Sequence, residues 1–209
     1  MTEHQQTNRQ VRHELVHRVL SVRLTASAAN HWYGAPMTST PESWNHETII
    51  RLVNDSKKRF LDLLLLADEQ ENMIDCYLER GDLFVMYEDG SPVTVCVVTD
   101  EGDGVFEVQN LAVRPDRQRH GYGQQMLRHV EAHYRGRARS LLVGTGDSPM
   151  TVPFYEACGF VFDHRVPRGI ADAYDHPIIE AGVQLIDKVY LRKAMDSAPA
   201  GPHEPGDAA

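Results

Sequence analysis

The stretch from Val105 to Tyr134 constrains the fold more than any other part of this chain. Apolar residues recur with a period of two up to Val113, which predicts a β-strand. A turn and a basic segment with two glycines follow, and then a helix whose apolar face holds Tyr122, Met126, Leu127, Val130 and Tyr134. The first turn of a helix has unpaired N–H groups and a partial positive charge, and glycines let a phosphate approach them. The segment from Gln118 to Gly123 is therefore predicted to hold a diphosphate.

Two common nucleotide-binding loops do not fit this segment. A dinucleotide loop, G-x-G-x-x-G, needs a third glycine where Met126 stands, and the triphosphate loop G-x-x-x-x-G-K-[ST] occurs nowhere in the chain. An ordinary strand–turn–helix connection with a basic surface loop is the alternative. Glycine at a helix start is otherwise unfavourable, which speaks against that alternative.

The string V-x-P-x-x-Q-x-x-G-x-G, from Val113 to Gly123, resembles the acetyl-CoA loop of the GNAT superfamily of N-acetyltransferases. The family signature [QR]-x-x-G-x-[GA] falls on Gln118, Gly121 and Gly123. About thirty residues later, Val152–Phe160 resembles a second family motif, a helix ending in an aromatic residue and a tyrosine, followed by Gly-Phe. The resemblance covers residues 48 to 195. It implies an α/β fold with a mixed, mostly antiparallel central sheet of six to seven strands, flanked by about four helices.

Turn residues and periodicity divide the 209-residue chain into one domain and two end segments. Residues 47–195 are the predicted N-acetyltransferase domain. Residues 1–46 form an extension that either docks on the domain or on a partner, which would explain Trp32 and Trp44, or is a disordered leader. Residues 196–209, rich in Pro, Ala and Gly, are predicted to be a disordered tail.

Composition limits the location and the partners of the protein. There is no apolar run long enough to span a membrane, no apolar centre of a secretory signal, and no C-x-x-C pair among the three cysteines. A cytoplasmic protein without a metal site or disulfides is expected. The net charge of −9 argues against a nucleic-acid binder and permits a cationic amine as substrate. A local basic cluster, formed by Arg114, Arg117, Arg119 and His120, suits an anionic cofactor.

Turn chemistry and apolar periodicity predict the remaining elements. Before the central stretch we expect a strand at Thr48–Val53, two helices between Asn54 and Gly81, and a hairpin of strands Leu83–Tyr87 and Val93–Val98. After it we expect a strand at Arg139–Val143, a short helix whose start is delayed by Pro153, a strand beginning at Phe160, a 17-residue irregular segment (Val166–Gly182) and a last strand at Gln184–Arg192.

Glu107 is the candidate general base. Strand alternation places Glu107, Gln109, Leu111 and Val113 on one face, where a carboxylate among apolar residues would be costly if it only filled the core. Its position six residues before Val113 matches the general-base glutamate of family members that resemble histone acetyltransferases. The alternative is a solvent-facing glutamate at a strand start, with deprotonation through water alone. Whether Glu107 itself would act directly or through water stays open.

The resemblance also implies the other site residues. Tyr155 would protonate the coenzyme A thiolate, the alternative being a core aromatic. The main chain of Leu111, Ala112 and Val113 would pair with the pantetheine arm, beside a bulge near Asn110 or Leu111. The side chain of Gln118 and the amides of the next six residues would hold the diphosphate: Arg119, His120, Gly121, Tyr122, Gly123 and Gln124. Family members often place an asparagine where this chain has Ser148, so a pantetheine contact there would be shorter.

The expected activity is transfer of the acetyl group from acetyl-CoA, as co-substrate, to a primary amine of a small molecule or peptide, by direct attack in a ternary complex. A non-catalytic acyl-CoA-binding module and a transferase of longer acyl chains are the alternatives. The acceptor pocket is expected near the irregular segment, where four polar residues either line it or face water: His164, Tyr174, His176 and Glu180. No nucleic-acid, membrane or metal partner is expected, and a homodimer is left open.

Overall fold

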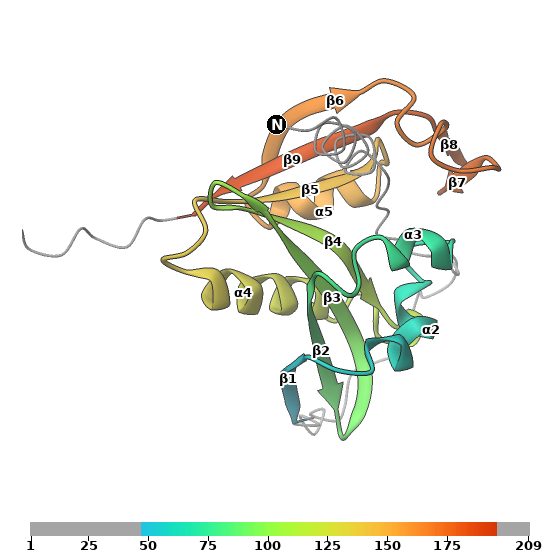
Figure 1. The fold of residues 1–209 in the computed structure, drawn as a ribbon. Coiled ribbons are helices and arrows are strands. Elements are labelled where there is room, and N and C mark those ends of the chain that lie inside the picture. Colours follow the sequence, from blue (N-terminus) through green and yellow to red (C-terminus); the bar gives the residue numbers. More distant parts are fainter. Residues whose placement is uncertain (1–46, 196–209) are drawn as a thin grey trace, which may run out of the picture.

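A computed structural model describes residues 47–195, which form a seven-stranded mixed sheet with helices on both faces (Figure 1). The strand order is β1-β2-β3-β4-β5-β9-β6, and every neighbouring pair is antiparallel except β4 and β5. The bounds are β1 (Thr48–Val53), β2 (Asp82–Glu88), β3 (Ser91–Gly102), β4 (Val105–Val113), β5 (Ser140–Gly146), β6 (Val161–Val166) and β9 (Lys188–Ala194). This confirms the expected mixed, mostly antiparallel sheet.

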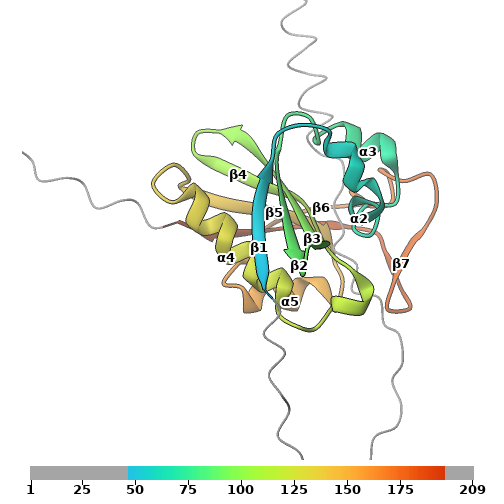
Figure 2. The same cartoon turned by 90° about the horizontal axis from the view of Figure 1, so that it is seen from below.

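Helices cover both faces of the sheet (Figures 1 and 2). One face carries α4 (Tyr122–Tyr134) and α5 (Thr151–Ala157), and its core includes Phe106, Val108, Leu111 and Met126. The opposite face carries the short helices η1 (Lys57–Phe60), α2 (Leu61–Leu64) and α3 (Glu71–Asp75), with a second core around Leu64, Ile74 and Ala112. We call these the α4 face and the α2 face.

The parallel strands β4 and β5 separate halfway along their length, as Figure 1 shows. They pair from Val105 with Ser140 to Val108 with Val143, and no further. Because β4 continues to Val113, its edge toward β5 has backbone groups without a sheet partner from Gln109 onward. An open edge of this kind can pair with an extended ligand.

A β-bulge at Gln109 corrects the predicted faces of β4. Val97 of β3 pairs with Asn110, whereas Val98 pairs with Val108, so that Gln109 is the extra residue. The bulge lies just before the expected position, and it reverses the alternation of side chains. Leu111 points into the core of the α4 face, while Ala112 packs on the α2 face. Glu107 therefore shares the α2 face with Asn110 and Ala112, and not a face with Leu111 and Val113.

The predicted last strand is divided into two strands, β8 (Val183–Leu185) and β9. β8 does not join the main sheet but pairs with β7 (Ile178–Glu180) in a separate hairpin. This hairpin begins inside the predicted irregular segment and ends just after it. The break has a physical cause, since the carbonyl of Ile186 accepts hydrogen bonds from the amides of Ile170 and Ala171, 3.0 and 3.1 Å long. The two helices expected between residues 54 and 81 are also shorter than predicted, at four and five α-helical residues.

The predicted extension (1–46) and tail (196–209) lie outside the described residues, so the structure does not test these two predictions. Among residues 47–195, no helix combines the length and the apolar character that crossing a membrane requires.

Candidate functional site

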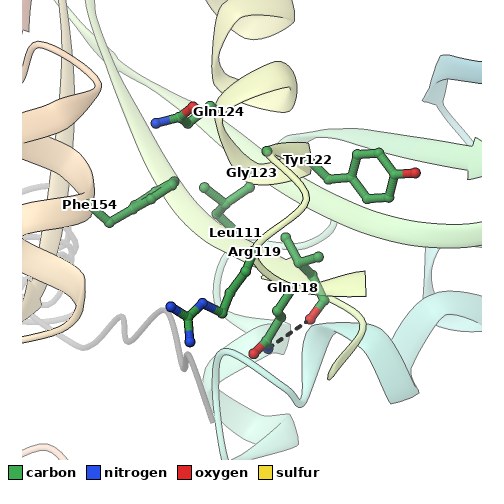
Figure 3. Close-up of a pocket in the computed structure, with 9 residues that line it drawn as sticks. Leu111, Gln118, Arg119, Tyr122, Gly123, Gln124 and Phe154 are labelled. Carbon is green, nitrogen blue, oxygen red and sulfur yellow. Dashed lines mark hydrogen bonds between the residues drawn. The ribbon is translucent and has the colours of Figure 1, made fainter. Parts of the chain in front are cut away.

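A cavity of about 440 Å³ lies where β4, the glycine loop and the starts of α4 and α5 meet (Figure 3). Its lining consists of Leu111, Val113, Gln118, Arg119, Gly121, Tyr122, Gly123, Gln124 and Phe154. Eight of these nine residues were predicted from the sequence as cofactor-binding residues. Phe154, which was not, comes from α5 and closes the wall opposite the loop. The cavity thus joins the predicted diphosphate loop to the open edge of β4.

The loop has the backbone shape of an anion-binding concavity. Arg119 and Gly121 have positive φ angles of 65° and 82°, so that successive N–H groups can turn toward one side. Gly121 stands at the N-cap of α4 and provides no side chain to bind the free N–H groups of the first turn. A Cβ at Gly123 would lie 3.1 Å from Cζ of Phe154, so glycine is needed there for close packing. The two glycines of the signature therefore have different physical roles.

Glu88 at the end of β2 holds the loop from both sides, a role that the sequence did not reveal. Its buried carboxylate accepts hydrogen bonds from Nε of Arg117, before the loop, and from the hydroxyl of Tyr122, after it. In Figure 3 the ring of Tyr122 accordingly points away from Phe154. Gln118 donates a 3.1 Å hydrogen bond to the carbonyl of Val113, which fixes the loop to β4. The role of Glu88 was missed because the sequence analysis assigned this residue to a hairpin turn.

The predicted basic cluster is largely neutralised by carboxylates. Arg114 forms an ion pair with Asp116 at 2.6 Å, and Arg117 pairs with Glu88 and Asp116. These partners hold the pKa of both guanidinium groups above their usual value. Arg119 has no carboxylate partner within residues 47–195 and lies at the cavity. Its charge is therefore the part of the cluster that is available to an anion.

Three predicted cofactor residues do not line the cavity with their side chains. Ala112 packs in the core of the α2 face, so that only its backbone could face a ligand at the β4 edge. The ring of His120 is exposed, with Nδ1 2.8 Å from the carbonyl of Gln118. The hydroxyl of Ser148 accepts hydrogen bonds from the amides of Met150 and Thr151, at 3.1 and 3.4 Å, and so is held at the start of α5. A pantetheine contact of Ser148 stays a prediction.

Tyr155 is fully buried on the α4 face, between the edges of Phe154 and Phe160. Its hydroxyl has no hydrogen-bond partner among the described residues. Burial, with weaker contributions from Cys96, Cys158 and Glu180, raises its pKa well above the usual value. The phenol therefore stays protonated. A buried hydroxyl without a partner costs free energy, which a ligand that accepts its proton would recover.

Glu107 is buried on the α2 face, with only 2% of its surface exposed, and its Oε1 has no hydrogen-bond partner among the described residues. Burial raises its pKa to about 7, although Lys188 and Arg80 act in the opposite direction. A carboxyl group with this pKa exchanges protons near neutral pH. The strand-start alternative, a glutamate facing solvent, is wrong for this structure.

Other polar groups gather near Glu107 on the α2 face. Asp68 accepts hydrogen bonds from the hydroxyls of Tyr174 (3.4 Å) and Tyr77 (3.5 Å), and burial raises its pKa to about 6. Tyr77 in turn accepts a 3.1 Å hydrogen bond from Asn110 of β4. Of the four predicted acceptor-side residues, Tyr174 and Glu180 are buried, whereas His164 and His176 are about half exposed. Among the described residues, no group of His, Cys, Asp or Glu side chains could hold a metal ion.

Comparisons with known proteins agree with this geometry. The sequence model of the Acetyltransferase (GNAT) domain matches residues 79–162. The N-acetyltransferase YvbK of Bacillus subtilis (strain 168) is 32% identical over 147 residues, which are 68% of this chain and 93% of the relative. This chain belongs to the GNAT family of acetyltransferases.

Solved GNAT structures share the fold and contain the cofactor. A GNAT acetyltransferase from Elizabethkingia anophelis with acetyl-CoA bound has a TM-score of 0.67 and 28% identity, covering 70% of this chain and 97% of its own. A Bacillus subtilis acetyltransferase in complex with CoA has a TM-score of 0.66 and 30% identity, covering 71% and 99%. The GNAT fold and the acetyltransferase family are thus established for this chain.

Proposed function

We propose that this acetyltransferase transfers the acetyl group of acetyl-CoA to a primary amine of a small molecule or a peptide, in a ternary complex of enzyme, cofactor and amine. The observation that carries the proposal is that one cavity connects three features: a helix start with free N–H groups, the Arg119 guanidinium, which has no carboxylate partner within residues 47–195, and the open edge of β4. Together they fit a ligand with an anionic end and an extended arm that forms strand-like hydrogen bonds.

Different residues of the cavity would bind different parts of the cofactor. The amides of Arg119 to Gln124, with the Arg119 side chain, would hold the diphosphate of acetyl-CoA. The backbone of Leu111, Ala112 and Val113 would bind the pantetheine arm at the open β4 edge. The bulge at Gln109 leaves backbone N–H groups at the bend, where one of them would polarise the thioester carbonyl. Acetyl-CoA supplies the activated acetyl group.

Glu107 and Tyr155 would handle the protons from opposite faces of the sheet. Glu107, with a pKa of about 7, would accept a proton from the ammonium form of the acceptor, directly or through water. As the amine nitrogen bonds to the acetyl carbon, the carbon–sulfur bond breaks and Tyr155 protonates the departing sulfur. Burial raises the pKa of a thiol as it does that of the phenol, so that the two groups remain matched. One proton is released for each protonated amine that is acetylated.

The acidic surroundings of the α2 face support an amine as the acceptor. Two carboxyl groups, those of Asp68 and Glu107, are buried there beside the ammonium group of Lys188, and the whole chain has a net charge of −9. An ammonium group is attracted to such a site, whereas a carboxylate would be repelled. The acceptor class proposed is therefore a cationic amine.

The test is a two-substrate kinetic analysis with the full chain. Acetyl-CoA and a panel of small amines and peptides are combined, free thiol is measured, and the product is identified by mass spectrometry. Initial rates with both substrates varied should give intersecting double-reciprocal lines, as a ternary complex requires. Parallel lines would contradict direct attack. Binding of acetyl-CoA without turnover of any amine would instead favour a non-catalytic acyl-CoA-binding module.

A further inference from the structure

Lys188, at the start of β9, is a buried cation that the proposed chemistry does not use. Its exposed fraction is 0%, and its Nζ donates no hydrogen bond to any described residue. The other buried lysine, Lys57, differs in this respect. Its Nζ donates to three backbone carbonyls, those of Leu78, Glu79 and Gly81, at 2.7 to 3.1 Å. Lys57 is thus a satisfied structural lysine, whereas the charge of Lys188 must be compensated by something other than hydrogen bonds.

The side chain of Lys188 crosses β5 at Gly144. A Cβ at Gly144 would overlap Cε of Lys188 and lie only 2.9 Å from its Nζ and 2.8 Å from Cε1 of Tyr190. The ammonium group lies 4.7 Å from the ring centre of Tyr190, so that a cation–π contact stabilises it there. A residue with a side chain at position 144 would block this path. The glycine therefore directs the ammonium from β9 across β5 and toward β4.

Glu107 lies on the same face as this ammonium group. It pairs with Leu142 of β5, and Gly144, two residues further along β5, shares the face of Leu142. Four further titratable or charged groups face the pair: Tyr190 of β9, Glu101 of β3, Arg80 after α3, and Asp68 after α2. Arg80 and Glu101 neutralise one another in a 2.8 Å ion pair. Lys188 is accordingly the cation that dominates the field at Glu107.

We propose that the ammonium group of Lys188 is the counter-ion of Glu107, delivered through the gap at Gly144 to keep that carboxylate charged and able to accept a proton from the acceptor amine. Lys188 is a positioning residue in this scheme, because it acts on the base and not on the substrate. The inference rests on the proposed function of Glu107 as the base. It extends that function by assigning a second residue, on a different strand, to the control of the base.

The electrostatic balance explains why such a counter-ion is needed. Burial alone favours the neutral carboxyl group, and it raises the pKa of Glu107 even with Lys188 present. The pKa of Lys188 is itself lowered by burial and supported by Glu107 first and Asp68 second. Each group thus favours the charged form of the other. Without the ammonium, a base at this position would be protonated at neutral pH.

The direct test is a carbon-13 NMR titration of the Glu107 carboxyl group, assigned with Glu107→Gln. In Lys188→Met, an apolar replacement of similar length, we expect the pKa of Glu107 to rise by at least about one pH unit. The matched control is Lys57→Met, which removes the other buried ammonium. This control should lower the melting temperature but leave the Glu107 titration in place. An unchanged or lowered Glu107 pKa in folded Lys188→Met would overturn the proposal.

Two further measurements cover the case in which Lys188→Met does not fold. Gly144→Ala keeps the charge but forces the Lys188 side chain off its path, and should also raise the pKa of Glu107. In the wild-type protein, the nitrogen-15 shift of the Lys188 Nζ should be that of an ammonium at pH 7.5. A neutral amine in that spectrum contradicts the proposal without any variant.

The pH dependence of the activity gives a further measurement, which would not change if Lys188 had only a structural role. The acidic limb of the pH profile of kcat/KM should move to higher pH in Lys188→Met. If the pKa of Glu107 rises by one pH unit, kcat/KM at pH 6 should be about tenfold lower than in the wild type. If the wild-type chain acetylates no amine, the proposed function fails, but the NMR titration still decides whether Lys188 is the counter-ion of Glu107. The two failures are therefore distinguishable.

Discussion

Two single atoms, the hydroxyl oxygen of Tyr155 and Oε1 of Glu107, are buried without a hydrogen-bond partner among the described residues. Buried polar atoms are normally paired, and the exceptions often mark functional positions. The two residues lie on opposite faces of the sheet, and Glu107 lies next to the last residue pair of β4 and β5. A reaction in the gap between these strands could therefore use one residue as a base and the other as an acid.

Tyr155→Phe should lower kcat by about 10² or more, because a positioned acid contributes on that order. Its thermal stability should not fall, since the deleted hydroxyl makes no hydrogen bond within residues 47–195 and its burial without a partner costs free energy. Tyr134→Phe is the matched control, because Tyr134 is equally buried but donates a 2.6 Å hydrogen bond to Asp82, at the far end of α4. The control should lose about 1 kcal/mol of stability and keep its activity. The reverse pattern, measured by kinetics and thermal unfolding, would remove Tyr155 from the mechanism.

Glu107→Gln should lower kcat/KM by about 10²-fold at pH 8 and abolish the acidic limb of its pH profile. The activity is expected to fall at low pH because a base must be deprotonated to accept a proton. Because the pKa of Glu107 is about 7, wild-type activity should fall as the pH drops below that value. Glu101→Gln is the control, since Glu101 raises the pKa of Glu107 and its removal should move the limb to lower pH. A limb that survives in Glu107→Gln would assign it to another group.

At this scale the sequence predicted which residues lie at the cavity better than which face of β4 each side chain occupies. Eight of eleven predicted cofactor residues line the cavity, because the glycine signature fixes the backbone of the loop. The predicted face of the Glu107 side chain was wrong. The bulge residue is Gln109, and nothing in the sequence at that position, such as a glycine, indicates a bulge. Lys188 was missed because nothing local to it shows that it is buried, and Glu88 was missed because its position was assigned to a hairpin turn.

Among the elements, the loop before α4 depends on one backbone conformation. Gly121 has a φ angle of 82°, and a Cβ there would meet nothing within 4 Å, so that a side chain is opposed by strain alone. Gly121→Ala should cost about 1 kcal/mol of stability and weaken acetyl-CoA binding, because the N–H groups of α4 would lose their alignment.

Gly102→Ala is the control for that substitution. Gly102 has a φ angle of 88° and equally open space, but it is the last residue of β3 and does not line the cavity. Its replacement should cost similar stability and leave the affinity for acetyl-CoA, measured by calorimetry, as in the wild type. Equal losses of affinity in both variants would mean that Gly121 acts only through general stability.

The elements themselves were predictable where their signals are local. Apolar alternation and turn residues located β1 to β4, and the 3.6-residue period located α4. The start of α5 after Pro149, with Pro153 in its first turn, follows from the missing N–H of proline. The break between β8 and β9 was not predictable, because it depends on hydrogen bonds from residues 170 and 171 to Ile186. Tertiary contacts of this kind leave no trace in a local pattern.

On the scale of the whole molecule, the proposed function depends on a separation of strands that no segment shows by itself. The neighbours β4 and β5 are parallel, and α4 connects them. The sheet then divides into a β1–β4 part and a β5, β9 and β6 part, each held together by antiparallel pairs. The cavity lies on the α4 face of this division, and the side chains of Glu107 and Asn110 lie on the α2 face. A ligand arm passing between the two strands would connect both sides.

Acetyl-CoA should therefore stabilise both parts of the sheet together. At a concentration of 100 times Kd, a ligand that binds only the folded state adds about 2.7 kcal/mol. For a domain of this size, that corresponds to a rise in melting temperature of roughly 5 to 10 °C. The rise should be smaller for free acetyl-pantetheine, which lacks the nucleotide and its diphosphate, at the same concentration.

The salt dependence of this stabilisation tests the assignment of charges. The chain has a net charge of −9, so that long-range electrostatics oppose the approach of an anionic cofactor, whereas Arg119 and the α4 start attract it locally. If the local contacts dominate, added salt should weaken binding, and Arg119→Gln should reduce both the affinity and its salt dependence. His120→Gln is the control, because its exposed ring does not line the cavity. Binding that strengthens with salt, measured by calorimetry between low and physiological ionic strength, would show that the net charge of the chain outweighs the loop.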